Sequence, residues 1–99
     1  MGMIAKDKPL RSPRYLRLVA DLGCCICGGQ AVAHHSTGGG IGRMGGKESD
    51  FMTLPLCERH HTGDEGVHRD WAAWERMYGR QVTHISRTVE KMLKGAGAL

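Results

Sequence analysis

The apolar positions near the start of the chain predict a helix. Ser12-Pro13 supplies an N-cap residue followed by proline at the first helical position. Apolar residues then recur at i, i+3, i+4 and i+7, namely Tyr15, Leu18, Val19 and Leu22. These four positions share one helical face, and Gly23 is expected to end the helix.

Helical spacing returns in the last third of the chain. Residues 70–78 predict a helix capped by Gly79, with Trp71, Trp74, Met77 and Tyr78 expected in the core rather than stacked on nucleic-acid bases. A further apolar stripe predicts a final helix that frays from Gly95 onward. This stripe is expected to pack in the core or to form a dimer interface, and its residues are Val82, Ile85, Val89, Met92 and Leu93. His84 lies outside the motifs and is expected to be a surface histidine.

The middle of the chain has a different pattern. Residues 30–36 and 51–56 are short apolar stretches that predict two strands, and Pro55 favours a sheet edge for the second. Six of the nine residues from Gly38 to Gly46 are glycine, and we interpret this segment as an insertion inside one domain. A short helix is expected to begin at Glu58 or Arg59.

Length, composition and charge add to this picture. A chain of 99 residues is one small domain, here divided into a flexible basic arm over 1–11, the domain over 12–94 and a frayed tail over 95–99. Fifteen glycines and five aromatic residues give a thin core, so another source of stability is expected. The net charge of +4 favours an anionic partner. No membrane span or signal region is recognisable, which predicts a soluble protein that stays in the cytoplasm.

The cysteines indicate what that source of stability is. Cys24-x-x-Cys27 and Cys57-x-x-His60 are two ligand pairs with the spacing of a structural zinc site. Such a site contributes about 10–16 kcal/mol of apparent binding free energy, comparable with the stability of a whole domain. The alternative is a set of buried thiols without metal. Cys25 is either a packed thiol or a replacement for Cys24 among the ligands.

Apart from His84, four histidines remain once His60 is assigned to zinc: His34, His35, His61 and His68. Neighbouring residues on a strand face opposite sides, so His34 and His35 are expected to have different tasks. A second metal held by His34, His61 and His68, with His35 as the base, would make a hydrolytic site. The alternative is that zinc is the only metal and these histidines lie at the surface.

Several of these motifs occur in an order that resembles a known family. They are Cys24-x-x-Cys27-Gly28, Ala33-His34-His35, Gly45-Gly46-Lys47-x-Ser49-Asp50 and Leu54-Pro55-Leu56-Cys57-x-x-His60-His61. Together they resemble zinc-knuckle HNH endonucleases, and within these the phage recombination-enhancement (Ref-like) nucleases and their prophage relatives. The resemblance implies an α+β fold with a small ββα-metal (HNH, or His-Me finger) core, a zinc knuckle and flanking helices at both ends.

The resemblance also implies roles for individual residues. His34 and His61 would bind the catalytic metal and His35 would be the general base. The candidate for a further ligand is His68, displaced from the family spacing by the insertion 62–67. Asp50 or Ser49 stands nearest to the place of the motif's asparagine, two residues early. Asp50 would orient the base, either by a hydrogen bond to the backbone across the loop or by accepting the other imidazole N–H of His35. Lys47 and Arg43 would contact phosphates.

The function expected from these features is a metal-dependent DNA endonuclease with low sequence specificity, encoded by a phage or prophage and acting on DNA in the bacterial host. Its catalytic ion would be Mg²⁺, Mn²⁺, Ni²⁺ or Zn²⁺, beside the structural Zn²⁺. The basic residues of the first segment would contact phosphates or form a solvated tail: Lys6, Lys8, Arg11 and Arg14. One alternative is a non-catalytic zinc module that binds nucleic acid or a partner protein. Another is a nuclease that cuts only when docked on a recombination or packaging protein.

Overall fold

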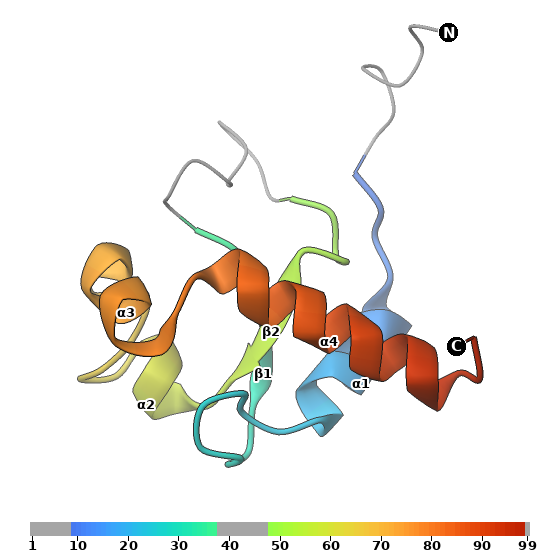
Figure 1. Cartoon of the computed structure of the whole chain (residues 1–99), viewed down its shortest axis with the longest axis horizontal. Helices are drawn as coiled ribbons and strands as arrows, with labels where there is room; N and C mark the ends of the chain where they lie inside the picture. The colour runs from blue at the N-terminus through green and yellow to red at the C-terminus, as the bar shows by residue number, and fades with distance from the viewer. Residues whose placement is uncertain (1–8, 38–47, 99) are drawn as a thin grey trace, which may run out of the picture.

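The computed structural model describes residues 9–37 and 48–98 of the chain (Figure 1). They form an α+β arrangement with the elements α1 (Pro13–Asp21), β1 (Val32–His35), β2 (Thr53–Leu56), α2 (Glu58–His61), α3 (Trp71–Tyr78) and α4 (Gln81–Gly95). Both predicted strands and the predicted helices are therefore confirmed within a few residues. Four of the predicted phosphate-contacting residues lie outside the described residues: Lys6, Lys8, Arg43 and Lys47. None of the described helices has the length and apolar character needed to cross a membrane.

The two strands form an antiparallel hairpin at the centre of the structure. Their register pairs Val32 with Leu56 and His35 with Thr53. All four residues of β2 are buried, because α1 packs on both strands and α4 packs on β2 (Figure 1). Alternation along β1 buries His34 and leaves the next residue, His35, only partly covered. The two histidines thus lie on opposite faces, as the sequence predicted.

The core combines the hairpin, the cysteine knuckle and the C-terminal helices. Its buried apolar residues are Cys24, Leu54, Leu56, Val67, Trp74 and Ile85. Two of these, Cys24 and Val67, come from segments without regular structure. The core therefore depends on irregular segments being held in place, as expected for a small chain with few aromatic side chains.

Helix α1 begins as predicted but buries less than predicted. The Ser12 hydroxyl accepts a hydrogen bond from Tyr15 N–H at 3.1 Å, which confirms the N-cap. Val19 is fully buried, whereas Leu18 and Leu22 remain 42% and 40% exposed. A hairpin of two strands covers only a narrow strip of a helix, so the predicted apolar face is half covered.

The C-terminal helices correct three sequence-based expectations. Trp74 is buried as expected, but Trp71 is 39% and Met77 71% exposed, because α3 turns only one side of its eight residues toward the core. The buried face of α4 is offset from the predicted apolar stripe and consists of Gln81, His84, Ile85 and Thr88.

His84 is therefore buried, and its predicted surface position is wrong. The turn at Gly79 brings α4 back against α3 so that His84 Nε2 donates to Tyr78 O at 2.7 Å. The ring also packs edge-on against Trp74. A hydrogen bond to the last residue of α3 satisfies a carbonyl that the helix end leaves open.

Candidate metal centres

A tight turn places the first cysteine pair. Cys24 N–H donates to Gly29 O at 2.8 Å, and Gly28 N–H donates back to Cys24 O at 2.8 Å. Gly28 has a φ of 79°, a left-handed conformation that glycine adopts without steric cost. This closed loop directs the Cys24 and Cys27 side chains toward the start of α2.

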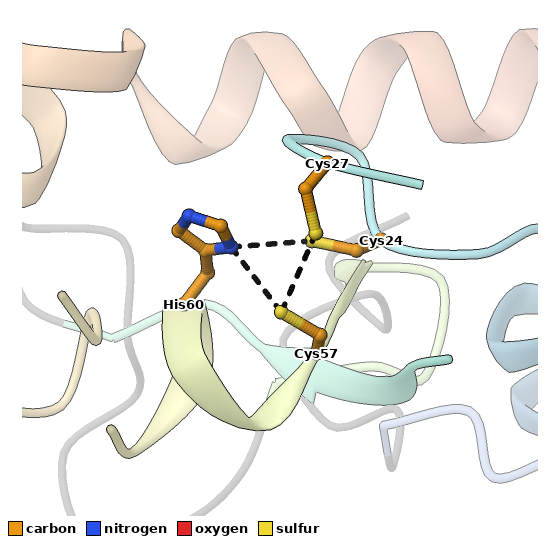
Figure 2. A group of neighbouring side chains, drawn as sticks. All are labelled: Cys24, Cys27, Cys57 and His60. Carbon is orange, nitrogen blue, oxygen red and sulfur yellow. Dashed lines mark hydrogen bonds between the residues drawn. The ribbon is translucent and has the colours of Figure 1, made fainter. Parts of the chain in front are cut away.

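Cys57, the N-cap residue of α2, and His60, within α2, complete a cluster of four side chains. Figure 2 shows the four side chains converging from the knuckle and from the first turn of α2. Cys57 Sγ lies 3.2 Å from His60 Nδ1 and 3.6 Å from Cys27 Sγ, and Cys24 Sγ lies 3.7 Å from His60 Nδ1. Tetrahedral zinc, with bonds of about 2.1–2.3 Å, has ligand atoms about 3.4–3.8 Å apart. The cluster is compatible with a structural zinc site made of three cysteines and one histidine.

The neighbouring cysteines Cys24 and Cys25 have pKa values shifted in opposite directions. Burial opposes ionisation of Cys24, but backbone hydrogen bonds, including those from Cys57 and Ile26, outweigh it and lower its pKa to about 6. Burial and the nearby Cys24 raise the pKa of Cys25 to about 12. Because zinc binds thiolate, Cys24 is suited to be the ligand. Cys25 packs against the core as a neutral thiol, which resolves the alternative left open by the sequence.

A network that the sequence did not reveal surrounds His60. The Glu65 carboxylate lies 3.9 Å from His60 Nε2 and accepts hydrogen bonds from Tyr78 Oη–H and from the Arg59 guanidinium. The Tyr78 ring also packs edge-on against the His60 ring at 5.3 Å. These contacts hold the imidazole so that Nδ1 points to the sulfur atoms. The sequence signal for these contacts is weak, because Glu65 and Tyr78 both follow the second metal-ligand pair without a recognisable spacing.

Three of the remaining histidines form a second cluster. His34 comes from β1, His61 from the last position of α2, and His68 from the following loop. His61 Nε2 and His68 Nε2 lie 3.1 Å apart, and the His34 ring centroid is 4.9 Å from each of the other two. Two imidazole nitrogens bound to one ion at about 2.1 Å are about 3.0–3.4 Å apart. The spacing therefore fits a shared divalent ion.

Two glycines allow His68 to join this cluster despite the six-residue insertion. The chain after α2 folds back so that Val67 N–H donates to His60 O at 3.0 Å and His68 N–H donates to His61 O at 3.1 Å. A Cβ at Gly66 would lie 2.5 Å from His61 O, and one at Gly63 would lie 2.8 Å from Arg59 Cα. Only residues without a Cβ permit this close approach.

Two of the three clustered histidines, His34 and His61, have lowered pKa values. Burial, followed by the proximity of His61 and His68, lowers the pKa of His34 to about 3. Burial and the neighbouring His68 also lower the pKa of His61. Since a metal ion binds the neutral ring, the lowered pKa values of His34 and His61 favour the form that coordination requires.

His35 and Asp50 form a pair beside this cluster. His35 Nε2 donates to Asp50 Oδ1 at 2.8 Å, which leaves Nδ1 as the ring nitrogen with a free lone pair. Of the two contacts considered for Asp50 from the sequence, with the backbone across the loop or with His35, the structure shows the carboxylate bonded to His35.

Asp50 is itself held from several sides. Burial raises the pKa of Asp50, but hydrogen bonds from Ser12 N–H at 2.6 Å and from His35, together with nearby Arg11, lower it below its usual value. Asp50 N–H donates to Leu10 O at 3.0 Å, and Arg11 donates to Glu48 O at 2.7 Å. The last residues of the predicted flexible arm are therefore bound to the segment that carries Asp50.

Both histidine features open onto one cleft. Its volume is about 340 Å³, and its lining residues are Ala33, His34, His35, Ser36, Thr37, Glu48, His61 and His68. The cleft brings the three metal-binding candidates and His35 to the same solvent-accessible space. Within the described residues, every predicted zinc ligand and every predicted catalytic-metal ligand lies in its expected cluster.

Comparison with known families finds one family whose model spans most of the chain. A family model described as "Protein of unknown function (DUF968)" matches residues 3–95. The chain belongs to the DUF968 family. The matched range includes both metal-ligand clusters and all of the described helices and strands.

One relative of this chain is "Uncharacterized protein YdfU" of Escherichia coli (strain K12), which is 40% identical over 81 residues. The alignment covers 81% of this chain and 22% of that protein, so the chain spans about a fifth of the relative's length. No solved structure matches the chain significantly.

Proposed function

We propose that this DUF968 chain is a metal-dependent endonuclease of the HNH type that hydrolyses phosphodiester bonds in DNA. The observation that carries the proposal is the His35–Asp50 pair beside a cluster of three histidines in one cleft. Hydrolysis needs both the pair and the cluster, because a water molecule must be deprotonated next to a centre that stabilises negative charge on the phosphate. Neither feature is needed to keep a structural zinc in place.

The histidine cluster supplies the binding side of this chemistry. His34, His61 and His68 would hold one divalent ion, and three protein ligands leave positions open toward the cleft. When bound, that ion stabilises negative charge on the phosphate and on the leaving oxygen. Mg²⁺, Mn²⁺, Ni²⁺ and Zn²⁺ remain the candidate ions.

His35 supplies the base. Its Nδ1 accepts a proton from water as the water oxygen attacks phosphorus and the bond to the leaving oxygen breaks. The Asp50 carboxylate keeps the proton on Nε2 and stabilises the imidazolium that forms. The hydrogen bonds to Asp50 from Ser12 and Arg11 hold the carboxylate in place for this role.

The arrangement of elements supports the same proposal. β1, β2 and α2 follow one another as strand, strand and helix, and they carry the base and two of the three ligands. This order fits a ββα-metal core braced by a zinc knuckle. The net charge of +4 favours DNA as the substrate, and the small surface favours low sequence specificity.

Plasmid cleavage by two matched variants tests the proposal. Zinc-loaded protein is incubated with supercoiled plasmid and chelator, Mg²⁺, Mn²⁺ or Ni²⁺. His35→Ala is expected to keep ion binding while the cleavage rate falls by about 10²–10⁴-fold. His68→Ala is expected to lose both ion binding and cleavage. Equal cleavage by His35→Ala and wild type overturns the role of the base.

The same assay decides against the main alternative. A non-catalytic zinc module needs only the three cysteines and His60, so it would retain one zinc and bind DNA without cutting it. Absence of cleavage with all ions, at full zinc occupancy, would favour that module. Cleavage that appears only when a recombinase–DNA filament is added would instead identify a partner-dependent nuclease.

A further inference from the structure

Gln81 is a fully buried polar residue at the first position of α4. Its side-chain Nε2 donates to Thr37 O at 2.6 Å, and its Oε1 accepts from Thr37 N–H at 3.1 Å. The same Oε1 lies 3.3 Å from His34 Nε2. Its backbone N–H donates to the Glu75 carboxylate at 2.8 Å, which fixes the start of α4. Gln81 therefore connects the end of β1, one histidine of the cluster and α4.

The two contacts with Thr37 determine which way the amide points. A backbone N–H requires an acceptor and a backbone carbonyl requires a donor. The reversed amide would oppose donor to donor and acceptor to acceptor, in a site shielded from water. Oε1 is therefore the atom that faces His34, and the imidazole must donate to it.

This donation selects one tautomer of His34. A neutral imidazole carries one proton, so a ring that donates through Nε2 keeps its lone pair on Nδ1. Which nitrogen of a histidine binds metal is set by the hydrogen bond that the other nitrogen makes. In the same cluster, His61 and His68 turn their Nε2 atoms toward each other.

We propose that Gln81 is a positioning residue that holds His34 in the Nε2–H tautomer and so makes Nδ1 its metal-binding atom. This inference rests on the proposed divalent-ion site, and it extends that site to a residue outside the HNH-like motifs. Gln81 is itself fixed by the Thr37 backbone, so the His34 ring cannot rotate without losing its hydrogen bond to a fixed amide.

Histidine-ring NMR spectra and Ni²⁺ titration test the inference. The zinc-loaded protein is compared with Gln81→Met, which keeps the side-chain length without hydrogen bonds, and with Gln81→Glu, which keeps an acceptor for His34. Thr88→Val is the matched control, because it removes a buried hydrogen bond from the same helix without contacting the cluster.

Before Ni²⁺ is added, ¹H–¹⁵N spectra of the rings are expected to show the Nε2–H tautomer of His34 in wild type, Gln81→Glu and Thr88→Val. Gln81→Met is expected to show a mixture. Calorimetry is expected to show Ni²⁺ binding weakened about 10–100-fold in Gln81→Met and unchanged in Thr88→Val.

Two results would overturn the role of Gln81: an Nδ1–H tautomer of His34 in wild type, or unchanged Ni²⁺ affinity in Gln81→Met. The wild-type spectrum remains decisive even if Gln81→Met does not fold. Failure of wild type to bind Ni²⁺ at the histidines would overturn the proposed function, together with the ligand role of Nδ1. That failure is distinguishable, because the tautomer spectra would still follow the Gln81 variants.

Discussion

Replacing Gly66 with alanine tests how the chain brings His68 back to His61. The new Cβ would lie 2.5 Å from His61 O, 2.7 Å from the His61 carbonyl carbon and 2.9 Å from Thr62 N. Ordinary contact begins at 3.4 Å, so the turn must open by about 0.9 Å at the carbonyl oxygen. All three neighbours are backbone atoms, which no change of rotamer can move aside.

This opening is expected to damage the histidine cluster more than the fold. Overpacking of this kind costs about 1–3 kcal/mol of stability, whereas a ligand misplaced by about 1 Å can cost about 10²-fold in rate. Gly66→Ala should therefore retain zinc, lose most Ni²⁺ affinity and cleave plasmid about 100-fold more slowly. The assays are zinc content, calorimetry and plasmid nicking, with thermal unfolding to measure stability.

Gly95→Ala is the matched control for this substitution. Gly95 lies at the end of α4, and a Cβ there meets no atom within 4 Å. Alanine at this helical position should change stability by about 0.5–1 kcal/mol in the favourable direction and leave Ni²⁺ binding unchanged. If Gly66→Ala bound Ni²⁺ and cleaved DNA like wild type, the turn would not be what places His68.

Two further predictions concern the cysteines and pH. Cys24→Ser should lose zinc and cooperative unfolding, because a structural zinc contributes about 10–16 kcal/mol, while the adjacent Cys25→Ser should keep one zinc per chain; metal analysis showing the reverse would exchange the two roles. The pKa of His34 is about 3 in the native state and 6.5 for the unperturbed group, so the unfolded chain binds a proton between these values that the native state does not. Stability without a divalent ion at the histidines should be complete above pH 6.5 and fall as pH drops toward 3. In urea unfolding, the free energy of unfolding should depend less on pH in His34→Asn than in wild type. An identical pH dependence in the two proteins would refute the lowered pKa of His34.

The sequence predicted the elements well where local signals agree. Ser12-Pro13 marked the start of α1. The short helix expected from Glu58 or Arg59 and the helix expected over 70–78 correspond to α2 and α3. It failed on which side of α4 is buried, because the side chains that bury there are polar. Gln81, His84 and Thr88 occupy the same helical face as Ile85, and each is hydrogen-bonded. A hydrophobic pattern cannot recognise a buried face whose polar side chains are satisfied by hydrogen bonds to backbone carbonyls.

The metal-ligand clusters were more predictable than their surroundings. Ligand types and spacing identified Cys24-x-x-Cys27 and Cys57-x-x-His60, and the structure brings these four together. Glu65 and Gln81 were not found, because their roles arise from contacts with residues far along the chain or across a turn. The return of His68 also needed the structure, since it depends on a turn shape that Gly63 and Gly66 permit but do not specify.

The adjacent residues His60 and His61 connect the two centres physically. Consecutive residues on a helix point about 100° apart, so one turn of α2 directs His60 to the cysteines and His61 to the other histidines. Helix α2 has only four residues and no side-chain cap at Cys57, and so short a helix is not stable by itself. Zinc held by Cys57 and His60 would keep this turn helical and thereby set the direction of His61. Zinc at the first cluster would then be a precondition for ion binding at the second, and chelation of zinc should remove divalent-ion binding at the histidines as well.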